Sequence, residues 1–245
     1  MKITLSLLAG LMLAGSNAAW AAGQVTVHAA QGSATLDNVQ DLAQLTTQPA
    51  LIDNVWWRGA VMAERGASAV AQQQRQQTLA DLRAWQTQTS GDRAAAIGEV
   101  LRQLSAVNVT GRQFISLDPD WIRLHPDANR RLEGSYDLWL TPEPDSVWLM
   151  GALHGAGKVR WQPGQTVRGY LEGHAHLSGA ENSYATVISP SGETQRVPVA
   201  YWNHRHVEVL PGSTIWLGFS SWSQPDGYDD LNKRMISVLT HRVPE

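Results

Sequence analysis

Apolar and polar residues alternate in the part of the chain that follows residue 21. Val25 and Val27 alternate with polar neighbours, which is typical of a half-buried strand, and a second short strand is expected at 34–36. Asp37 and Gln40 have the three-residue spacing of a capping box, so a short helix is expected to begin there. The predicted order is therefore strand, strand, helix.

The period changes to that of a helix between residues 68 and 107. Leu79, Leu82 and Trp85 recur every three residues in a stretch rich in Ala, Gln and Arg. A break at 90–92 precedes a second apolar face, formed by Ile97, Val100, Leu101, Leu104 and Val107. Because the connection is so short, the two helices must form an antiparallel hairpin. Strand patterns lie on both sides, so we expect a helical hairpin inserted at about 62–107.

Strand patterns return after residue 108 and continue to residue 223. Tyr136, Leu138 and Leu140 alternate with polar residues, and the rigid, polar segment 141–145 is suited to a domain boundary. Short apolar segments with Gly- and Pro-containing turns between them follow at 147–153, 159–161, 167–171, 185–188, 197–202, 207–210 and 215–219. This pattern predicts an α+β protein with a first domain at 22–145 and a second, β-rich domain at 146–223.

The last segment, 224–245, again has the period of a helix. Its apolar residues share one face and are Tyr228, Leu231, Met235, Val238 and Leu239. A helix of about 13 residues spans only about 20 Å, so a single charged copy is too short to cross a membrane. Two interpretations stay open: the helix packs on its own domain, or it is released to engage a membrane or a pore.

The first 21 residues have the pattern of an export signal. Lys2 precedes an apolar run from Ile3 to Leu13, and Ala19 and Ala21 are the small residues expected before a cleavage site. The run is too short to be a stable membrane span. We therefore expect a cleavable signal peptide at 1–21 and, in a Gram-negative cell, a periplasmic mature protein without a stable membrane span.

Charge and composition exclude several classes of function. The 245 residues include 19 basic and 22 acidic side chains, and this balance disfavours nucleic-acid binding because phosphates require a concentrated positive field. The absence of cysteine excludes disulfides, thiol catalysis and Cys-ligated metals. The chain has 11 Trp, and only 3 of its 19 basic residues are Lys. A recognition surface is therefore expected to use tryptophan and arginine.

Catalytic motifs are missing from the sequence. It has no nucleophile elbow, zinc-protease motif or phosphate-binding glycine loop, so no catalytic residue is assigned. The pairs His174/His176 and His204/His206 could each turn two imidazoles to one side of a strand, but no third metal ligand is evident nearby. We therefore expect no metal and no cofactor. A polysaccharide hydrolase, the enzymatic alternative, would use the loosely spaced acids Asp118, Asp120, Glu133 and Asp137.

Tryptophan and arginine are concentrated in a few short segments. Trp rings stack on the apolar faces of sugar rings and Arg pairs with carboxylates, so these residue types suit a glycan. The candidate ligand-binding residues are Trp56, Trp57, Arg58, Arg112, Trp202, His204, Arg205 and His206. Arg112, directly after the hairpin, is expected in a functional or inter-domain pocket. The tryptophans within strand patterns are instead expected in the core, at Trp139, Trp148, Trp161 and Trp216.

Three segments carry a recognisable pattern: WWRGAV at 56–61, VTGR at 109–112 and VAYWNHRHVEVLPG at 199–212. Together they resemble the GfcC family of capsule biosynthesis proteins, encoded with group 4 capsule genes, and the similarity covers essentially the whole chain after residue 21. The resemblance implies two tandem β-grasp (ubiquitin-like) domains, as in the periplasmic part of Wza-type polysaccharide exporters. It also implies a helical hairpin in the first domain, an amphipathic C-terminal helix and no catalytic residues.

The function expected from these features is that of a non-enzymatic periplasmic accessory protein for capsular polysaccharide or exopolysaccharide assembly or export. It would bind the glycan, proteins of the export machinery, or both. The chain has no cysteine to carry a lipid, unlike Wza-type channels, which favours a soluble accessory over an independent channel. The alternatives are an adaptor whose C-terminal helix engages a membrane or pore partner, and a polysaccharide-modifying hydrolase.

Overall fold

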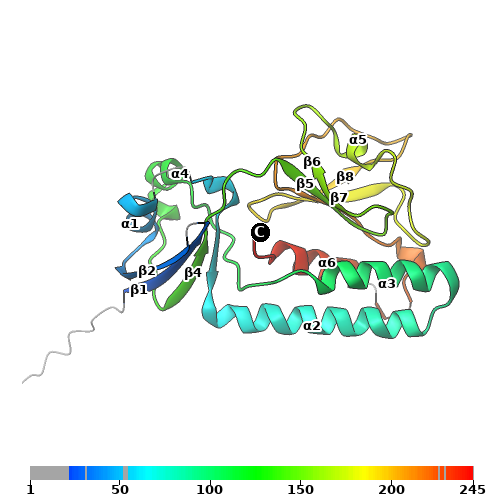
Figure 1. Cartoon of the computed structure of the whole chain (residues 1–245), viewed down its shortest axis with the longest axis horizontal. Helices are drawn as coiled ribbons and strands as arrows, with labels where there is room; N and C mark the ends of the chain where they lie inside the picture. Colours follow the sequence, from blue (N-terminus) through cyan, green and yellow to red (C-terminus); the bar gives the residue numbers. More distant parts are fainter. Residues whose placement is uncertain (1–21, 31, 52–54, 226, 229, 245) are drawn as a thin grey trace, which may run out of the picture.

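The computed structural model describes residues 22–30, 32–51, 55–225, 227–228 and 230–244, which form two lobes, each built on a mixed sheet (Figure 1). The predicted signal peptide lies outside the described residues. The predicted α+β class is confirmed, because the chain forms a four-stranded and a five-stranded sheet, with helices between the strands in sequence order. In the described part of the chain, no helix combines the length and apolar character that a membrane span needs.

The first sheet has the strand order β2-β1-β4-β3. β1 (Gly23–Ala29) and β2 (Gly32–Val39) form an antiparallel hairpin, and β4 (Ser135–Trp139) runs parallel to β1. β3 (Val61–Glu64) is antiparallel to β4 at the edge of the sheet. The inward side chains of this sheet form a core of their own with the short helices α1 (Leu42–Thr46) and α4 (Pro119–Leu124).

Helix α1 begins later than the sequence pattern predicts. The capping box expected at Asp37 and Gln40 is wrong, because β2 continues to Val39. Asp41 is the N-cap: its carboxylate accepts from the N–H of Gln44 at 2.8 Å, and the Gln44 side chain accepts from the N–H of Gln40 at 2.6 Å. The capping interaction therefore has the expected residue types and spacing, but lies four positions further along the chain.

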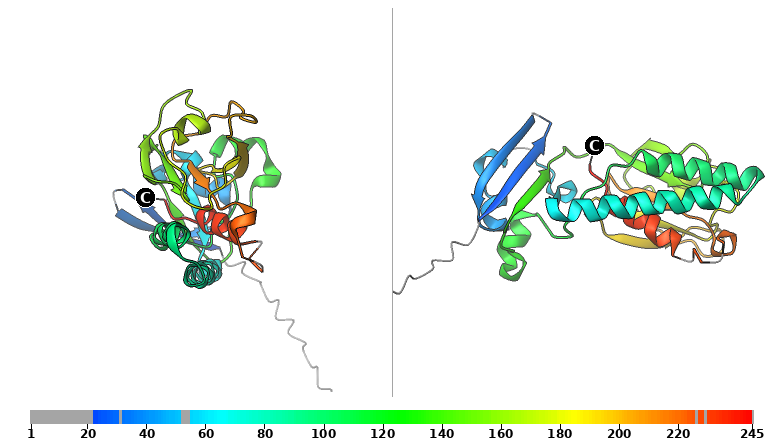
Figure 2. Two further views of the ribbon diagram at one scale, coloured as in Figure 1. Left: turned by 90° about the vertical axis from the view of Figure 1, so that its right-hand side faces the viewer. Right: turned by 90° about the horizontal axis from the view of Figure 1, so that it is seen from below.

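The predicted helical hairpin is inserted between β3 and β4, but it packs on the second sheet. Its helices α2 (Arg65–Thr87) and α3 (Gly91–Ser105) run side by side along the second lobe (Figures 1 and 2). Their inward side chains belong to the same buried cluster as the second sheet. Gln103 closes this interface, because its side chain donates to the carbonyl of Gly151 at 3.1 Å and accepts from the N–H of Gly151 at 2.7 Å.

The second sheet has the strand order β6-β5-β9-β7-β8. β5 (Ser146–Gly151) and β9 (Thr214–Leu217) form a parallel pair at its centre, and the other neighbours are antiparallel. The remaining elements of this lobe are β6 (Gly157–Arg160), α5 (Val167–Leu171), β7 (Tyr184–Ile188) and β8 (Thr194–Pro198). Short 3-10 turns occur at Pro49–Leu51, Trp57–Gly59, Pro126–Ala128 and Ser221–Ser223.

The C-terminal helix α6 (Leu231–Thr240) completes the core of the second lobe. Leu231 and Met235 are fully buried, and Arg234 forms an ion pair with Asp81 of α2. Beyond the helix, the N–H of Val243 donates to the carbonyl of Asn108 at 2.9 Å. The apolar face of this helix is therefore covered by the hairpin and the sheet, and the end of the chain returns to the junction of the lobes.

The tryptophans expected in the core differ in their burial. Trp216 on β9 is 1% exposed and confirms the expectation. Trp139, Trp148 and Trp161 are only half-buried, and the last two pack against the core of the second lobe. The expectation that the strand tryptophans lie in the core is therefore confirmed for Trp216 and only in part for the others.

Candidate functional site

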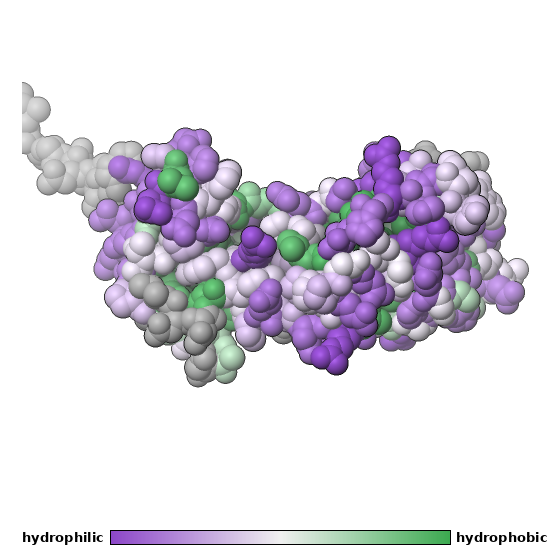
Figure 3. Space-filling model, turned by 90° about the horizontal axis from the view of Figure 1, so that it is seen from above, coloured by the Kyte–Doolittle hydropathy of each residue, from purple (hydrophilic) through white to green (hydrophobic). Residues whose placement is uncertain are grey.

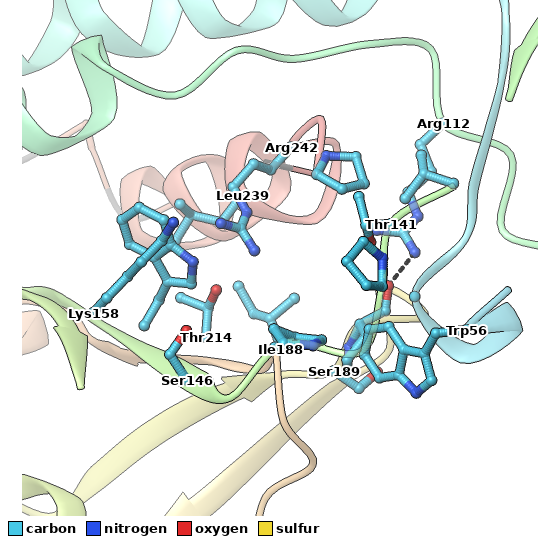
Figure 4. Close-up of a pocket in the computed structure, with 18 residues that line it drawn as sticks. Trp56, Arg112, Thr141, Ser146, Lys158, Ile188, Ser189, Thr214, Leu239 and Arg242 are labelled. Atoms are coloured by element: carbon cyan, nitrogen blue, oxygen red, sulfur yellow. Dashed lines mark hydrogen bonds between the residues drawn. The ribbon is translucent and has the colours of Figure 1, made fainter. Parts of the chain in front are cut away.

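A small cleft lies between the two lobes, next to the C-terminal end of α6 (Figure 4). The first lobe contributes Trp56 and Arg112, the second contributes Trp148 and Lys158, and Arg242 follows α6. The cavity volume is about 80 Å³. That is room for a few water molecules and far below the volume of pockets that enclose whole ligands. The cleft is therefore of the size to hold one polar or charged group of a larger molecule.

Arg112 is buried in this cleft, and within the described residues its guanidinium donates to main-chain carbonyls. One Nη donates to the carbonyl of Pro190 at 2.5 Å and the other to the carbonyl of Thr240 at 3.4 Å. Burial, together with the positive charge of Arg242, lowers the pKa of Arg112 to about 10. The side chain stays protonated at neutral pH, and among the described residues it has no carboxylate partner. The cleft thus contains a desolvated positive charge.

Two further basic side chains line the same cleft. The Lys158 ammonium and the Arg242 guanidinium lie 4.8 Å and 5.0 Å from the ring centre of Trp148. Figure 4 shows Arg242 between Lys158 on one side and Arg112 on the other. No acidic side chain lines the cleft within the described chain. We call it the cationic cleft, defined by Arg112, Lys158 and Arg242.

The chain around Arg112 is fixed by close packing at Gly111. A Cβ on Gly111 would lie 2.5 Å from the main chain of Ala67 and Ser68 at the start of α2, so only glycine fits. The N–H of Gly111 donates to the Ser68 hydroxyl at 3.0 Å, and the N–H of Thr110 donates to the carbonyl of His241 at 2.9 Å. This part of the VTGR segment therefore holds Arg112 between α2 and the end of α6.

The WWRGAV segment turns its first two rings to different sides. Trp56 lines the cationic cleft and packs close to Gly212, where an added Cβ would lie 3.3 Å from Cη2 of the Trp56 ring. The 3-10 turn that follows directs Trp57 and Arg58 into a second hollow between the lobes. The structure thus brings Trp56 together with Arg112 and places Trp57 and Arg58 in the adjoining space.

The second hollow has a volume of about 440 Å³ and is bordered by exposed aromatic rings. Phe114 is 53% exposed and Trp121 is 49% exposed. We call it the aromatic groove, and it is lined by Trp57, Arg58, Ala60, Phe114, Ile115, Ser116, Leu117, Asp118, Trp121, Ser191, Glu193 and Leu210.

The other predicted site residues lie in an exposed loop after β8. Trp202 is 74% exposed, and His204, Arg205 and His206 are also exposed. This loop follows Pro198, which pairs with Tyr184 at one end of the β7–β8 ladder, whereas the turn that borders the cationic cleft joins the two strands at the other end. The structure therefore does not bring these four residues together with Arg112.

The histidine pairs considered as metal ligands make separate local contacts. Nδ1 of His174 lies 2.8 Å from the carbonyl oxygen of His154, and Nδ1 of His176 lies 2.7 Å from Asn182 Oδ1. Nδ1 of His204 lies 2.9 Å from the Tyr201 carbonyl oxygen. Nowhere in the described ranges do three His, Asp or Glu side chains gather as a metal site would require.

The acids considered for a hydrolase have different partners. Asp118 is the N-cap of α4, and Asp120 pairs with Arg123 at 3.0 Å on the surface. Asp137 on β4 pairs with Arg65 at 2.9 Å, and Nε2 of His28 lies 2.9 Å from it. Hydrogen bonding from Arg65, and then from His28, holds the pKa of Asp137 below its ordinary value. Asp137 therefore links the start of α2 to the first sheet.

Several residues of the two hollows were not found from the sequence. Lys158 and Arg242 meet at Trp148 only because the chain end returns to the junction of the lobes. Phe114 lies in no periodic segment, and Trp121 lies on a helix of six residues that is too short to give a pattern. Lysine is rare in this chain, and that rarity is the feature of the sequence that draws attention to Lys158.

The two sheets, the helical hairpin and the cationic cleft define a two-lobed α+β protein with a cleft between its lobes. Residues 19–143 match the N-terminal domain of capsule biosynthesis GfcC and residues 155–244 match its C-terminal domain, so the chain belongs to the GfcC family. A curated relative, the uncharacterized protein YjbG of Escherichia coli (strain K12), is 42% identical over 244 residues, covering 98% of each chain.

Proposed function

We propose that this chain is a non-enzymatic periplasmic accessory protein that assists capsular polysaccharide assembly or export by binding an acidic group of the glycan in the cationic cleft. Membership of the capsule biosynthesis family supports the context. The export-signal pattern of residues 1–21 supports the periplasmic location. The observation that carries the ligand class is Arg112, a buried cation whose hydrogen-bond acceptors in the described chain are main-chain carbonyls, with no carboxylate among them.

The burial of Arg112 favours an anionic ligand. A buried guanidinium next to a second one is destabilised by desolvation and repulsion, and an incoming carboxylate would offset both effects. The guanidinium fork matches the two oxygens of a carboxylate, which also fits a cavity of this size. Uronic acids and pyruvylated sugars carry such a group on a ring that would stay outside the cleft.

We infer in addition that each sheet is a β-grasp module. Both strand orders place a parallel pair at the centre of the sheet, with an antiparallel hairpin on one side. In the second lobe the short helix α5 follows the first hairpin, as in ubiquitin-like folds. These features support the tandem β-grasp architecture that the family resemblance implies, and with it a relation to export proteins.

The absence of bond-breaking chemistry is part of the proposal. The acids that a hydrolase would use are engaged separately, Asp118 in a helix cap and Asp137 in an ion pair with Arg65. A glycosidase requires two carboxyl groups facing one another across a substrate. Incubation of the protein with capsule polysaccharide should leave the size profile of the glycan unchanged, and shortened chains would contradict a non-enzymatic role.

Ligand binding is tested by titrating trigalacturonate and following tryptophan fluorescence, with uncharged maltotriose as the control ligand, whose response should not depend on Arg112. Trp56 and Trp148 line the cleft and report on it. Arg112→Gln should weaken trigalacturonate binding by about tenfold or more, because a charge-assisted bidentate contact is lost. Arg83→Gln, on the exposed face of α2, is the matched control. No response of the wild type at millimolar trigalacturonate, or an equal response in Arg112→Gln, would overturn the assignment.

A further inference from the structure

The aromatic groove and the cationic cleft are lined by the same segments of the chain. Trp56 lines the cleft and the adjacent Trp57 lines the groove. In the same way, Arg112 lines the cleft and Phe114 lines the groove. The guanidinium carbon of Arg112 lies 5.8 Å from the ring centre of Phe114. Seen from above, some hydrophobic residues are exposed where the two lobes meet, and others are scattered over both lobes (Figure 3). The two hollows therefore adjoin one another.

Trp121 in the groove is exposed but held in place. Its ring stacks on His125 with centroids 3.7 Å apart and an interplanar angle of 19°. Nδ1 of His125 lies 3.0 Å from the Trp121 carbonyl oxygen, and the N–H of Trp121 donates to the Asp118 cap at 3.2 Å. An exposed ring that is already ordered loses little conformational entropy when a ligand stacks on it.

Phe114 is the second exposed ring of the groove, and it is also packed from behind. It meets His241 edge to face, with centroids 5.3 Å apart and an angle of 87°. The turn after β7 approaches it so closely that a Cβ on Gly192 would lie 2.8 Å from its ring. Phe114 and Trp121 therefore form two fixed apolar surfaces that border one hollow.

Polar side chains surround these rings. Arg58 offers guanidinium donors, and the carboxylates of Asp118 and Glu193 offer acceptors, one from each lobe. Oδ1 of Asp118 accepts the capping hydrogen bonds from the N–H groups of Asp120 and Trp121. An apolar acyl chain would place these charges against hydrocarbon at a high cost, whereas a sugar has apolar ring faces and a rim of hydroxyl groups. The mixture of residues thus favours a carbohydrate.

We propose that the aromatic groove is a second carbohydrate subsite, which takes an uncharged pyranose ring on Trp121 and Phe114 next to the acidic group held in the cationic cleft. The inference rests on the proposed function and extends it. The bound segment then contains at least one acidic and one neutral sugar in sequence. Its neutral ring is recognised by stacking, which depends on the ring face and not on one particular sugar.

The test uses the full mature protein with maltohexaose and cellohexaose, measured by saturation-transfer NMR, and trigalacturonate in parallel. Trp121→Ala should weaken binding of the neutral hexasaccharides by about tenfold or more and leave trigalacturonate binding unchanged. Trp121→Phe should keep most of the affinity, because a ring remains. The control is Trp222→Ala, since Trp222 is 71% exposed and lines neither hollow.

Two results would overturn the inference. One is equal binding of the neutral hexasaccharides by Trp121→Ala and Trp222→Ala; the other is no binding of either hexasaccharide by the wild type at millimolar concentration. If trigalacturonate still binds in these cases, the proposed function stands and only the second subsite fails. If trigalacturonate fails while the neutral ligands bind, the groove stands and the cationic cleft loses its proposed role. Circular dichroism melting of each variant separates lost binding from lost folding.

Discussion

The guanidinium of Arg112 donates to the main-chain carbonyl of Pro190, which lies 78 positions further along the chain. This hydrogen bond joins the segment after the helical hairpin to the turn between β7 and β8, and so connects the two lobes directly. Arg112 lines the cationic cleft and the neighbouring Phe114 lines the aromatic groove. The contact between Arg112 and Pro190 therefore joins the two lobes at the place where the two hollows adjoin.

Replacement of Arg112 should separate function from folding. Arg112→Ala removes two hydrogen bonds and also a buried charge, so we expect the free energy of unfolding to fall by only about 1–3 kcal/mol. Surface polysaccharide should fall much further in a deletion strain complemented with this variant. Arg83→Ala is the control, and the readouts are surface capsule and melting temperature. If capsule loss only matches that of other variants with the same melting temperature, Arg112 is a structural residue.

The turn at Gly192 should be sensitive to a single added methyl group. Gly192 has φ +90°, and a Cβ there would lie 2.8 Å from the Phe114 ring and 3.1 Å from Arg112 Cζ. Gly164 has φ +75° with no atom within 4 Å of its Cβ position. Both Ala variants are strained by about 1–2 kcal/mol, but only Gly192→Ala also displaces the inter-lobe contact. We expect it alone to weaken trigalacturonate binding. Equal melting temperatures and affinities in the two variants would contradict the close contact.

Gln103 should be critical for docking of the hairpin. It is buried and satisfies both main-chain groups of Gly151. Gln103→Ala leaves the N–H of Gly151 unpaired and removes one of the two donors to its carbonyl, the other being the N–H of Leu153. We expect the free energy of unfolding in urea to fall by about 1–3 kcal/mol. Gln72→Ala on the exposed side of α2 should change it by less than about 0.5 kcal/mol. A similar small effect of both substitutions would show that the Gln103 contacts add nothing to stability.

Asp137 should contribute to acid sensitivity. Its pKa in the folded state is held below the ordinary value of 3.8, mainly by the hydrogen bond from Arg65. Its contribution to stability is therefore complete above that ordinary value and is lost as the pH falls through the lower, folded-state pKa. Asp137→Asn should lower stability at neutral pH and reduce the loss of stability on acidification. Urea unfolding across this range checks the prediction, and an unchanged pH dependence would contradict it.

Helix α6 should be required for folding of the second lobe. Met235 is fully buried, and Met235→Ala should lower the free energy of unfolding by about 2–4 kcal/mol because a cavity forms. Lys233→Ala, on the exposed side of the same helix, is the control. Truncation after Ser223 should remove the cooperative melting transition. A truncated chain that still melted cooperatively would show that the helix can be released, as the adaptor interpretation requires.

Local pattern was sufficient to predict the α+β class and the longer helices, because periodicity reports which side of an element is buried. The strand expected at 167–171 is wrong, because this short segment forms helix α5 with Thr166 as its N-cap. It could not show which sheet covers the hairpin, since the apolar face of Leu82 and Ile97 would fit either lobe. The start of α1 was misplaced for a related reason: Asp37 and Asp41 both suit an N-cap, and pairing of β2 with β1 decides between them.

The candidate site was predicted in part. Arg112 was expected in an inter-domain pocket and lies between the lobes, with Trp56 beside it. Lys158 and Arg242 could not be found, because their proximity depends on how the lobes and the chain end meet. The loop residues Trp202 and Arg205 stay predictions, since they lie at the opposite end of the β7–β8 ladder.

The hairpin of α2 and α3 has a consequence for how the molecule is made. Residues 65–105 leave the ribosome before β5 to β9 exist, yet those strands are what cover their apolar side chains. The second lobe is therefore complete only when nearly all of the polypeptide has been synthesised, whereas the core of the first lobe ends at Leu140. Cutting the chain at 141–145 would separate the hairpin from the sheet that covers it, so the second lobe cannot fold from its own half of the sequence.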